Sequence, residues 1–207
     1  MKPEAIFYTL AGMFFGVILG WVMGVQAGPR AASTPVASSA TTGAAQAGTT
    51  NQRTPPPLDE GKVQALTTIL SSDPKNAGAA VQLANVYFDA EKFDDAIGWY
   101  RKALDLNPSD PDASTDLGVS YYYTNRTDEA LAQFEKSLAM DAKHTKTMLN
   151  KGIVLAFGKQ DITGATAEWQ RVVDLAPDSP EGAAAKRALE GVASAHANGA
   201  AAPPAGN

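Results

Sequence analysis

The stretch that decides the fold is LANVYFDAEKFDDAIGWYRKALDLNPSDPDASTDLGVSYYYTNRTDEALAQF, residues 83–134. It holds the same apolar pattern twice, displaced by 34 residues. The matching pairs are Leu83 and Leu117, Tyr87 and Tyr121, Ala96 and Ala130, and Tyr100 and Phe134. A fixed offset of this length indicates an array of repeated supersecondary units.

The pattern continues towards the carboxyl end. The offset of 34 carries Gly118 to Gly152, and after the turn near Gln160 it becomes 35, which takes Phe134 to Trp169. We interpret the change as one residue inserted in that turn. Upstream, Leu66, Ile69 and Pro74 match the second half of a unit, so the array should open with a half repeat.

Each unit is expected to be a pair of short amphipathic helices. In residues 81–104 the apolar side chains recur at helical spacing in two runs, and small residues lie where the paired helices would approach each other. Prolines at 74, 108 and 177 are expected to end one helix before the next begins. Ser179, Pro180 and Glu181 are typical of the start of a further, capping helix.

The order L-G-x-x-Y, A-x-x-x-F and a closing proline, seen here at Leu117, Gly118, Tyr121, Ala130 and Phe134, resembles the tetratricopeptide repeat (TPR) family. Lys151 departs from it, because it stands where leucine is usual. The resemblance implies an all-α solenoid of stacked helix pairs. Its expected parts are a half repeat at 59–76, three TPR units at 77–110, 111–144 and 145–178, and a cap helix at 179–193.

The amino-terminal segment predicts a single transmembrane helix, because residues 5–27 carry no charge over a length that spans a bilayer. A cleaved signal peptide is the alternative. Gly12, Gly16, Gly20 and Gly24 recur every four residues and predict a helix-packing face, which makes a homodimer possible. Residues 28–58 are rich in Ala, Ser, Thr and Pro and are expected to be a disordered linker, like the tail at 194–207.

Composition and charge exclude several functions. The chain lacks cysteine, so disulfides, thiolate metal sites and cysteine nucleophiles are excluded. Its net charge is −5, and residues 1–58 carry +2, which leaves −7 for residues 59–207 and argues against a nucleic-acid partner. His144 and His196 are far apart in sequence. We therefore expect no metal, no cofactor and no enzymatic activity.

Binding is the expected activity, because a stack of helix pairs presents a concave surface made by the first helix of each unit. The residues predicted to line this groove are Val81, Asn85, Phe88, Thr115, Val119, Tyr122, Tyr123, Leu149, Ile153 and Phe157. Asn85, Lys146 and Asn150 resemble residues of TPR proteins that clamp a carboxylate, but Val81 and Thr115 stand where further cations are expected. An apolar peptide or helix is the favoured ligand.

These features predict a membrane-anchored scaffold that binds a protein or peptide partner during assembly of envelope complexes. The expected location is the bacterial inner membrane, as a single-pass protein with a periplasmic TPR domain. The alternative is a chaperone of cytochrome c maturation that presents apocytochrome to haem lyase. It rests on the similarity of residues 167–171 (AEWQR) and 175–181 (LAPDSPE) to the TPR module of that apparatus.

Overall fold

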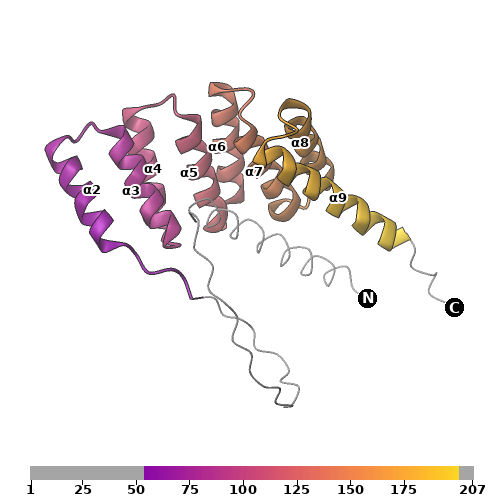
Figure 1. The fold of residues 1–207 in the computed structure, drawn as a ribbon, viewed down its shortest axis with the longest axis horizontal. Coiled ribbons are helices and arrows are strands. Elements are labelled where there is room, and N and C mark those ends of the chain that lie inside the picture. Colours follow the sequence, from indigo (N-terminus) through magenta and orange to yellow (C-terminus); the bar gives the residue numbers. More distant parts are fainter. Residues whose placement is uncertain (1–53, 201–207) are drawn as a thin grey trace, which may run out of the picture. The chain divides into compact units, whose positions relative to one another are not determined.

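The structure, a computed structural model, describes residues 54–200, and their side chains as far as residue 197. This part of the chain forms an array of α-helices and contains no strand (Figure 1). The helices are α2 (Glu60–Ser72), α3 (Ala77–Asp89), α4 (Phe93–Leu106), α5 (Pro111–Tyr123), α6 (Thr127–Met140), α7 (Thr145–Gly158), α8 (Ile162–Leu175) and α9 (Pro180–Ala200).

The predicted membrane segment, its glycine series and most of the predicted linker lie outside the described residues. Within residues 54–200, none of the helices has both the length and the apolar character needed to cross a bilayer.

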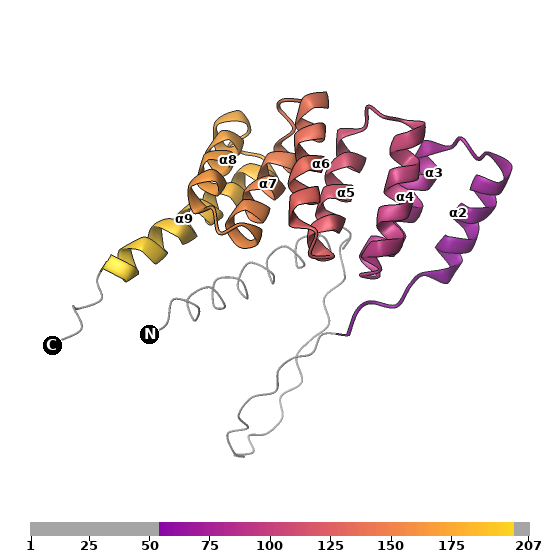
Figure 2. The same cartoon turned by 180° about the vertical axis from the view of Figure 1, so that it is seen from behind.

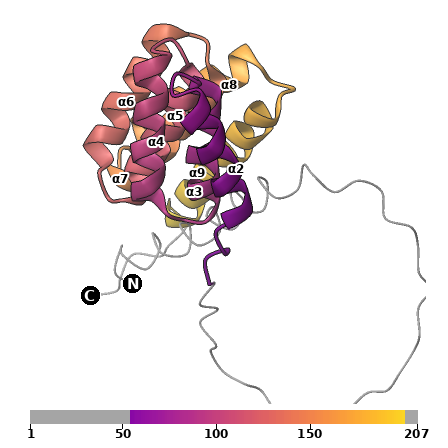
Figure 3. The ribbon, with the colours of Figure 1, turned by 90° about the vertical axis from the view of Figure 1, so that its left-hand side faces the viewer.

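The helices pack in chain order as three pairs, α3 with α4, α5 with α6, and α7 with α8. Each pair also packs against the next, α2 covers the first pair, and α9 covers the last (Figures 1 and 2). Figure 3 looks along the array and shows the successive helices stacked behind one another. This is the all-α solenoid of stacked helix pairs that the sequence predicts.

Short polar side chains begin most of these helices, as the sequence suggests. Asp59, Asn76, Asp110 and Asp161 each accept a hydrogen bond from a backbone N–H in the first turn of α2, α3, α5 and α8. The hydroxyl of Ser179 accepts one from the Gly182 N–H at 2.9 Å, at the start of α9. These bonds satisfy donors that a helix leaves open at its amino end.

The turn within each pair repeats one unusual backbone conformation. Glu91, Asn125 and Gln160 all have φ near +60°, in the left-handed region that glycine favours. The sequence suggested that the third unit has one extra residue in its turn. The structure shows that the extra residue is not in the turn. Instead α7 runs one residue further than α3 and α5, to Gly158, and the turn keeps its conformation.

The core alternates small residues on the first helix of a pair with large rings on the second. Phe134 and Trp169 are fully buried, and each ring lies directly over a glycine, Gly118 and Gly152 respectively. The indole N–H of Trp169 donates to the Leu149 carbonyl at 3.2 Å. The small residues therefore allow the close helix approach that the repeat pattern predicts.

The cap helix is longer than predicted. We expected it to end near residue 193, with a disordered tail from 194, but α9 continues to Ala200. Residues 193–197 are rich in alanine and contain neither glycine nor proline, so the helix can continue past residue 193. His196 lies within α9, where its Nδ1 is 2.9 Å from the Val192 carbonyl oxygen.

Candidate protein-binding surface

The candidate surface is one side of α3, α5 and α7, the first helix of each pair. Residues four and seven positions apart, such as Val81, Asn85 and Phe88 on α3, share one side of a helix. We call this side the first-helix face. Nine of the predicted residues keep some exposure there: Val81, Asn85, Phe88, Val119, Tyr122, Tyr123, Leu149, Ile153 and Phe157. Asn85 is the most open of them, and the others are half-buried.

The tenth prediction, Thr115, is wrong. Its side chain is fully buried and belongs to a cluster of hydroxyl groups where α5, α6 and α7 meet. The Thr115 hydroxyl lies 2.6 Å from that of Thr147 and 3.0 Å from that of Ser137, and it donates to the Pro111 carbonyl at 2.7 Å. Thr115 therefore joins the second and third units and is not available to a ligand.

Aromatic side chains gather at the end of this face, near the turn that follows α3. Phe93, the first residue of α4, stacks on Tyr123 with ring centres 4.5 Å apart. Phe88 meets both rings edge-on, at 5.2 Å from Phe93 and 5.9 Å from Tyr123. Phe88 and Tyr123 therefore make part of their contacts within the array, where they join the first two units.

Polar groups cross the first-helix face from α3 to α7. The buried Tyr100 of α4 donates its hydroxyl to the Asn85 side chain at 2.6 Å, and burial raises the pKa of this hydroxyl. Lys146 of α7 lies 2.8 Å from Asp116 and 3.4 Å from Asp112, both on α5. Lys146, which resembles a cation of the TPR proteins that clamp a carboxylate, is therefore already paired with two carboxylates of its own chain.

The charges on this face shift each other's pKa. Burial alone would lower the pKa of Lys146, but Asp116 and Asp112 outweigh it and raise the pKa above the ordinary lysine value. Burial raises the pKa of Asp116, and Lys146 only partly opposes this effect. These groups are partly desolvated, since 38% of the Lys146 side chain and 25% of the Asp116 side chain are exposed.

Sequence reasoning missed the two aspartates, although a signal was present. Asp112 and Lys146 occupy the same register in successive units, since they are 34 residues apart. Opposite charges at one register of neighbouring repeats are brought side by side by the stacking. Asn150, which occupies the register of Asp116, donates instead to the Lys146 carbonyl at 2.8 Å.

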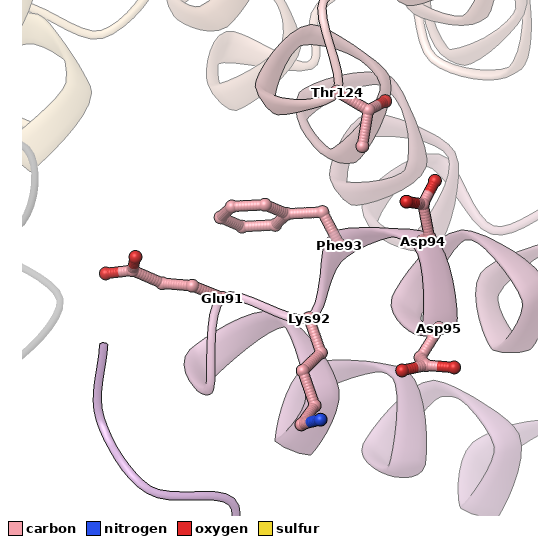
Figure 4. A pocket seen from close by; sticks show the side chains of 6 residues that line it. All are labelled: Glu91, Lys92, Phe93, Asp94, Asp95 and Thr124. Carbon is pink, nitrogen blue, oxygen red and sulfur yellow. The ribbon is translucent and has the colours of Figure 1, made fainter. Parts of the chain in front are cut away.

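A small pocket lies next to the turn between α3 and α4. It encloses about 210 Å³ and is lined by Glu91, Lys92, Phe93, Asp94, Asp95 and Thr124. This volume is below the roughly 300–1,000 Å³ of typical small-molecule sites. Figure 4 shows that its three carboxylates point in different directions. No group of His, Asp or Glu side chains within the described residues is arranged to hold a metal ion.

Comparisons with known proteins agree with this architecture. A family model described as TPR repeat matches residues 84–124, and one described as tetratricopeptide repeat matches residues 115–180. No curated protein matches the chain.

Solved structures share the fold. A crystal structure of MamA is 19% identical, with a TM-score of 0.56, over 65% of this chain and 78% of that one. The first TPR of Spaghetti (RPAP3) bound to HSP90 peptide SRMEEVD is 26% identical, with a TM-score of 0.53, over 60% and 96%. The first TPR domain of human RPAP3, solved by NMR, is 25% identical, with a TM-score of 0.51, over 58% and 95%. The array from residue 84 to residue 180 is therefore made of tetratricopeptide repeats.

Proposed function

We propose that the chain is a membrane-tethered scaffold whose first-helix face binds a segment of a protein partner. One observation carries the proposal. Val119 and Ile153 occupy the same register of α5 and α7 and are only half-buried, although both are apolar. Repeated apolar side chains along one side of a solenoid are suited to an extended or helical segment laid across the units.

The comparison with a peptide-bound structure supports a peptide as the type of ligand. The first TPR of Spaghetti (RPAP3) was solved with HSP90 peptide SRMEEVD, and its fold covers 60% of this chain. A peptide ligand is thus compatible with an array of this size. Enzymatic activity is not part of the proposal, and its absence stays a prediction from the sequence.

The proposal can be tested by photocrosslinking in intact cells. A benzoylphenylalanine at the exposed Gln82, one turn before Asn85 on α3, should crosslink a protein partner. The same group at the exposed Ala139, on α6, is the matched control and should give little product. Equal crosslinking at both positions, or products at Ala139 alone, would place the binding surface elsewhere.

The tether is the second part of the proposal. Residues 5–27 are uncharged and apolar, and they lie outside the described part of the chain. If they anchor the protein, the full chain should stay in the membrane pellet after carbonate extraction, and a chain lacking residues 1–27 should be released. Release of the full chain would instead support a cleaved or peripheral segment. We place the anchored scaffold in assembly of envelope complexes, as the sequence suggests.

The alternative role in cytochrome c maturation gains nothing from the structure. The residues that suggested it have structural uses here: Trp169 fills the core of the third unit, and Ser179 begins α9. Glu168 forms ion pairs with Lys151 and Arg171, both at 2.7 Å. Such residues are explained by folding alone, so we keep the general scaffold as the proposed function.

A further inference from the structure

The cations on the helices of the proposed binding surface are already paired. Helices α3 and α5 contain no lysine or arginine, and α7 contains only Lys146 and Lys151. Lys146 lies between Asp112 and Asp116, as described above. Lys151 is 2.7 Å from both Glu135 and Glu168, which belong to α6 and α8. An acidic ligand on this surface would have to compete with carboxylates of the chain itself.

The carboxylates on the same three helices are in excess. They are Asp89, Asp112 and Asp116, and Lys146 is the one lysine of these helices that pairs with any of them, Asp112 and Asp116. The His144 Nε2 also lies 3.5 Å from Asp112. Asp112 is well exposed, with 66% of its side chain open to solvent, and Asp116 keeps 25%. Asp89 at the end of α3 is also exposed.

These carboxylates border the apolar part of the surface. Asp112 and Val119 lie on the same side of α5, two turns apart. Burial raises the pKa of the Tyr100 hydroxyl, which donates to Asn85, and the charges of Asp116 on α5 and Asp89 on α3 raise it further. The charge of Lys62, on α2, acts on Asp89 and favours its ionised form.

Burial raises the pKa of Asp89, and Lys62 opposes this only weakly. Asp116, with 25% of its side chain exposed, is partly desolvated, and a carboxylate in such a position gains more from a cationic partner than one in open water. Complementary charge on a ligand would therefore be favoured on this side of the array, whereas further negative charge would be disfavoured.

We propose that the first-helix face selects partner segments that carry a lysine or arginine beside apolar side chains, and that Asp116 and Asp89 are the specificity-determining residues. This inference rests on the proposed function and names the ligand class of that surface. The apolar side chains of the segment would contact Val119 and Ile153. Its cation would lie between α3 and α5, near the Asn85 side chain.

Selection from a random peptide library on the full chain, purified in a mild detergent, tests the inference. The recovered peptides should be enriched in Lys or Arg together with apolar residues, relative to the starting library. An enriched peptide should bind about two- to fivefold more weakly to Asp116→Asn and to Asp89→Asn, which corresponds to the range of partly exposed charge pairs. The peptide SRMEEVD should bind more weakly than SRMKKVK, in which lysine replaces its three acidic residues.

Three variants separate the outcomes. Ile153→Glu tests the proposed surface, and each Asp→Asn variant tests the charge selection, with circular dichroism as the check on folding. Asp89→Asn keeps the test valid if Asp116→Asn does not fold, since Asp89 is exposed. Peptides that lose binding in Ile153→Glu but not in either Asp→Asn variant would overturn this inference alone. Peptides insensitive to Ile153→Glu would overturn the proposed function itself. Enrichment of acidic peptides would also overturn the charge selection.

Discussion

Replacing Gly118 with alanine tests the packing on which the whole array depends. A Cβ atom at Gly118 would lie 2.5 Å from Cε1 and 2.8 Å from Cδ1 of Phe134, and 3.2 Å from the Ala130 carbonyl oxygen. Phe134 is fully buried, so its ring has no free space to move into. Overpacking of this kind costs about 1–3 kcal/mol, and alanine returns up to about 1 kcal/mol as a better helix former. We therefore expect a net loss of about 1–2 kcal/mol.

Gly98 provides the matched control. It lies in the middle of α4, is exposed, and would place a Cβ atom with no other atom within 4 Å. Gly98→Ala should therefore stabilise the protein by about 0.5–1 kcal/mol through helix propensity alone. The two variants make the same chemical change, and only their surroundings differ.

Urea denaturation followed by circular dichroism at 222 nm measures both changes. Gly118→Ala should lower the midpoint and Gly98→Ala should raise it, with unchanged slopes. The loss in Gly118→Ala should shrink when Phe134 is replaced by leucine, because the ring that causes the clash is then absent. If Gly118→Ala were as stable as Gly98→Ala, the close helix approach described here would be wrong.

Three further predictions use the same assay. Tyr121→Ala should lower the free energy of unfolding by about 3–5 kcal/mol, because Tyr121 is buried. Tyr122 is half-buried, so Tyr122→Ala should lower it by clearly less, roughly 1–2 kcal/mol. Equal losses would contradict the different burial of the two side chains. Glu91→Gly should stabilise the chain by about 1 kcal/mol, because glycine adopts φ +57° without the penalty that other residues have there; a loss of stability would refute this. Burial alone would lower the pKa of Lys151, but Glu135 and Glu168 outweigh it and raise this pKa. The pKa of Lys151 is therefore higher in the folded than in the unfolded protein. Its ion pairs thus stabilise the fold fully below about pH 10. The deficit of Lys151→Met, about 1–3 kcal/mol, should therefore be constant at neutral pH and shrink as the pH rises above about 10, whereas a deficit that persisted there would point to packing rather than charge.

The helix pairs could be predicted from the sequence because the signals that fix them are local or periodic. The offset of 34 residues, the prolines between units and the small residues opposite large rings together determine which helices pair. Tyr121, which belongs to the repeated apolar pattern, is buried. The linker-like composition of residues 194–207 predicts a disordered tail, but α9 continues to Ala200, so composition alone does not locate the end of this helix.

The surface was harder to predict, because exposure depends on neighbours that no single helix reveals. Thr115 has the same register as Val81 and Leu149, and both of those remain half-exposed. Thr115 alone is fully buried, since Ser137 and Thr147 offer hydroxyl partners that the other two units lack. Lys146 is a similar case. From its residue type it resembled a free cation, but Asp112 and Asp116 on the neighbouring α5 pair with it.

Position 151 shows how an exception to the repeat pattern can be consistent with the fold. Leu83 and Leu117 are buried at this register, and Lys151 replaces them in the third unit. A lone ammonium group would be costly there, but Glu135 and Glu168 both reach it at 2.7 Å, and Glu168 is held in turn by Arg171. The lysine stem still covers apolar surface while its charge is neutralised. The departure from the pattern is therefore compensated from α6 and α8, which explains why the third unit keeps the same helix pairing as the first two.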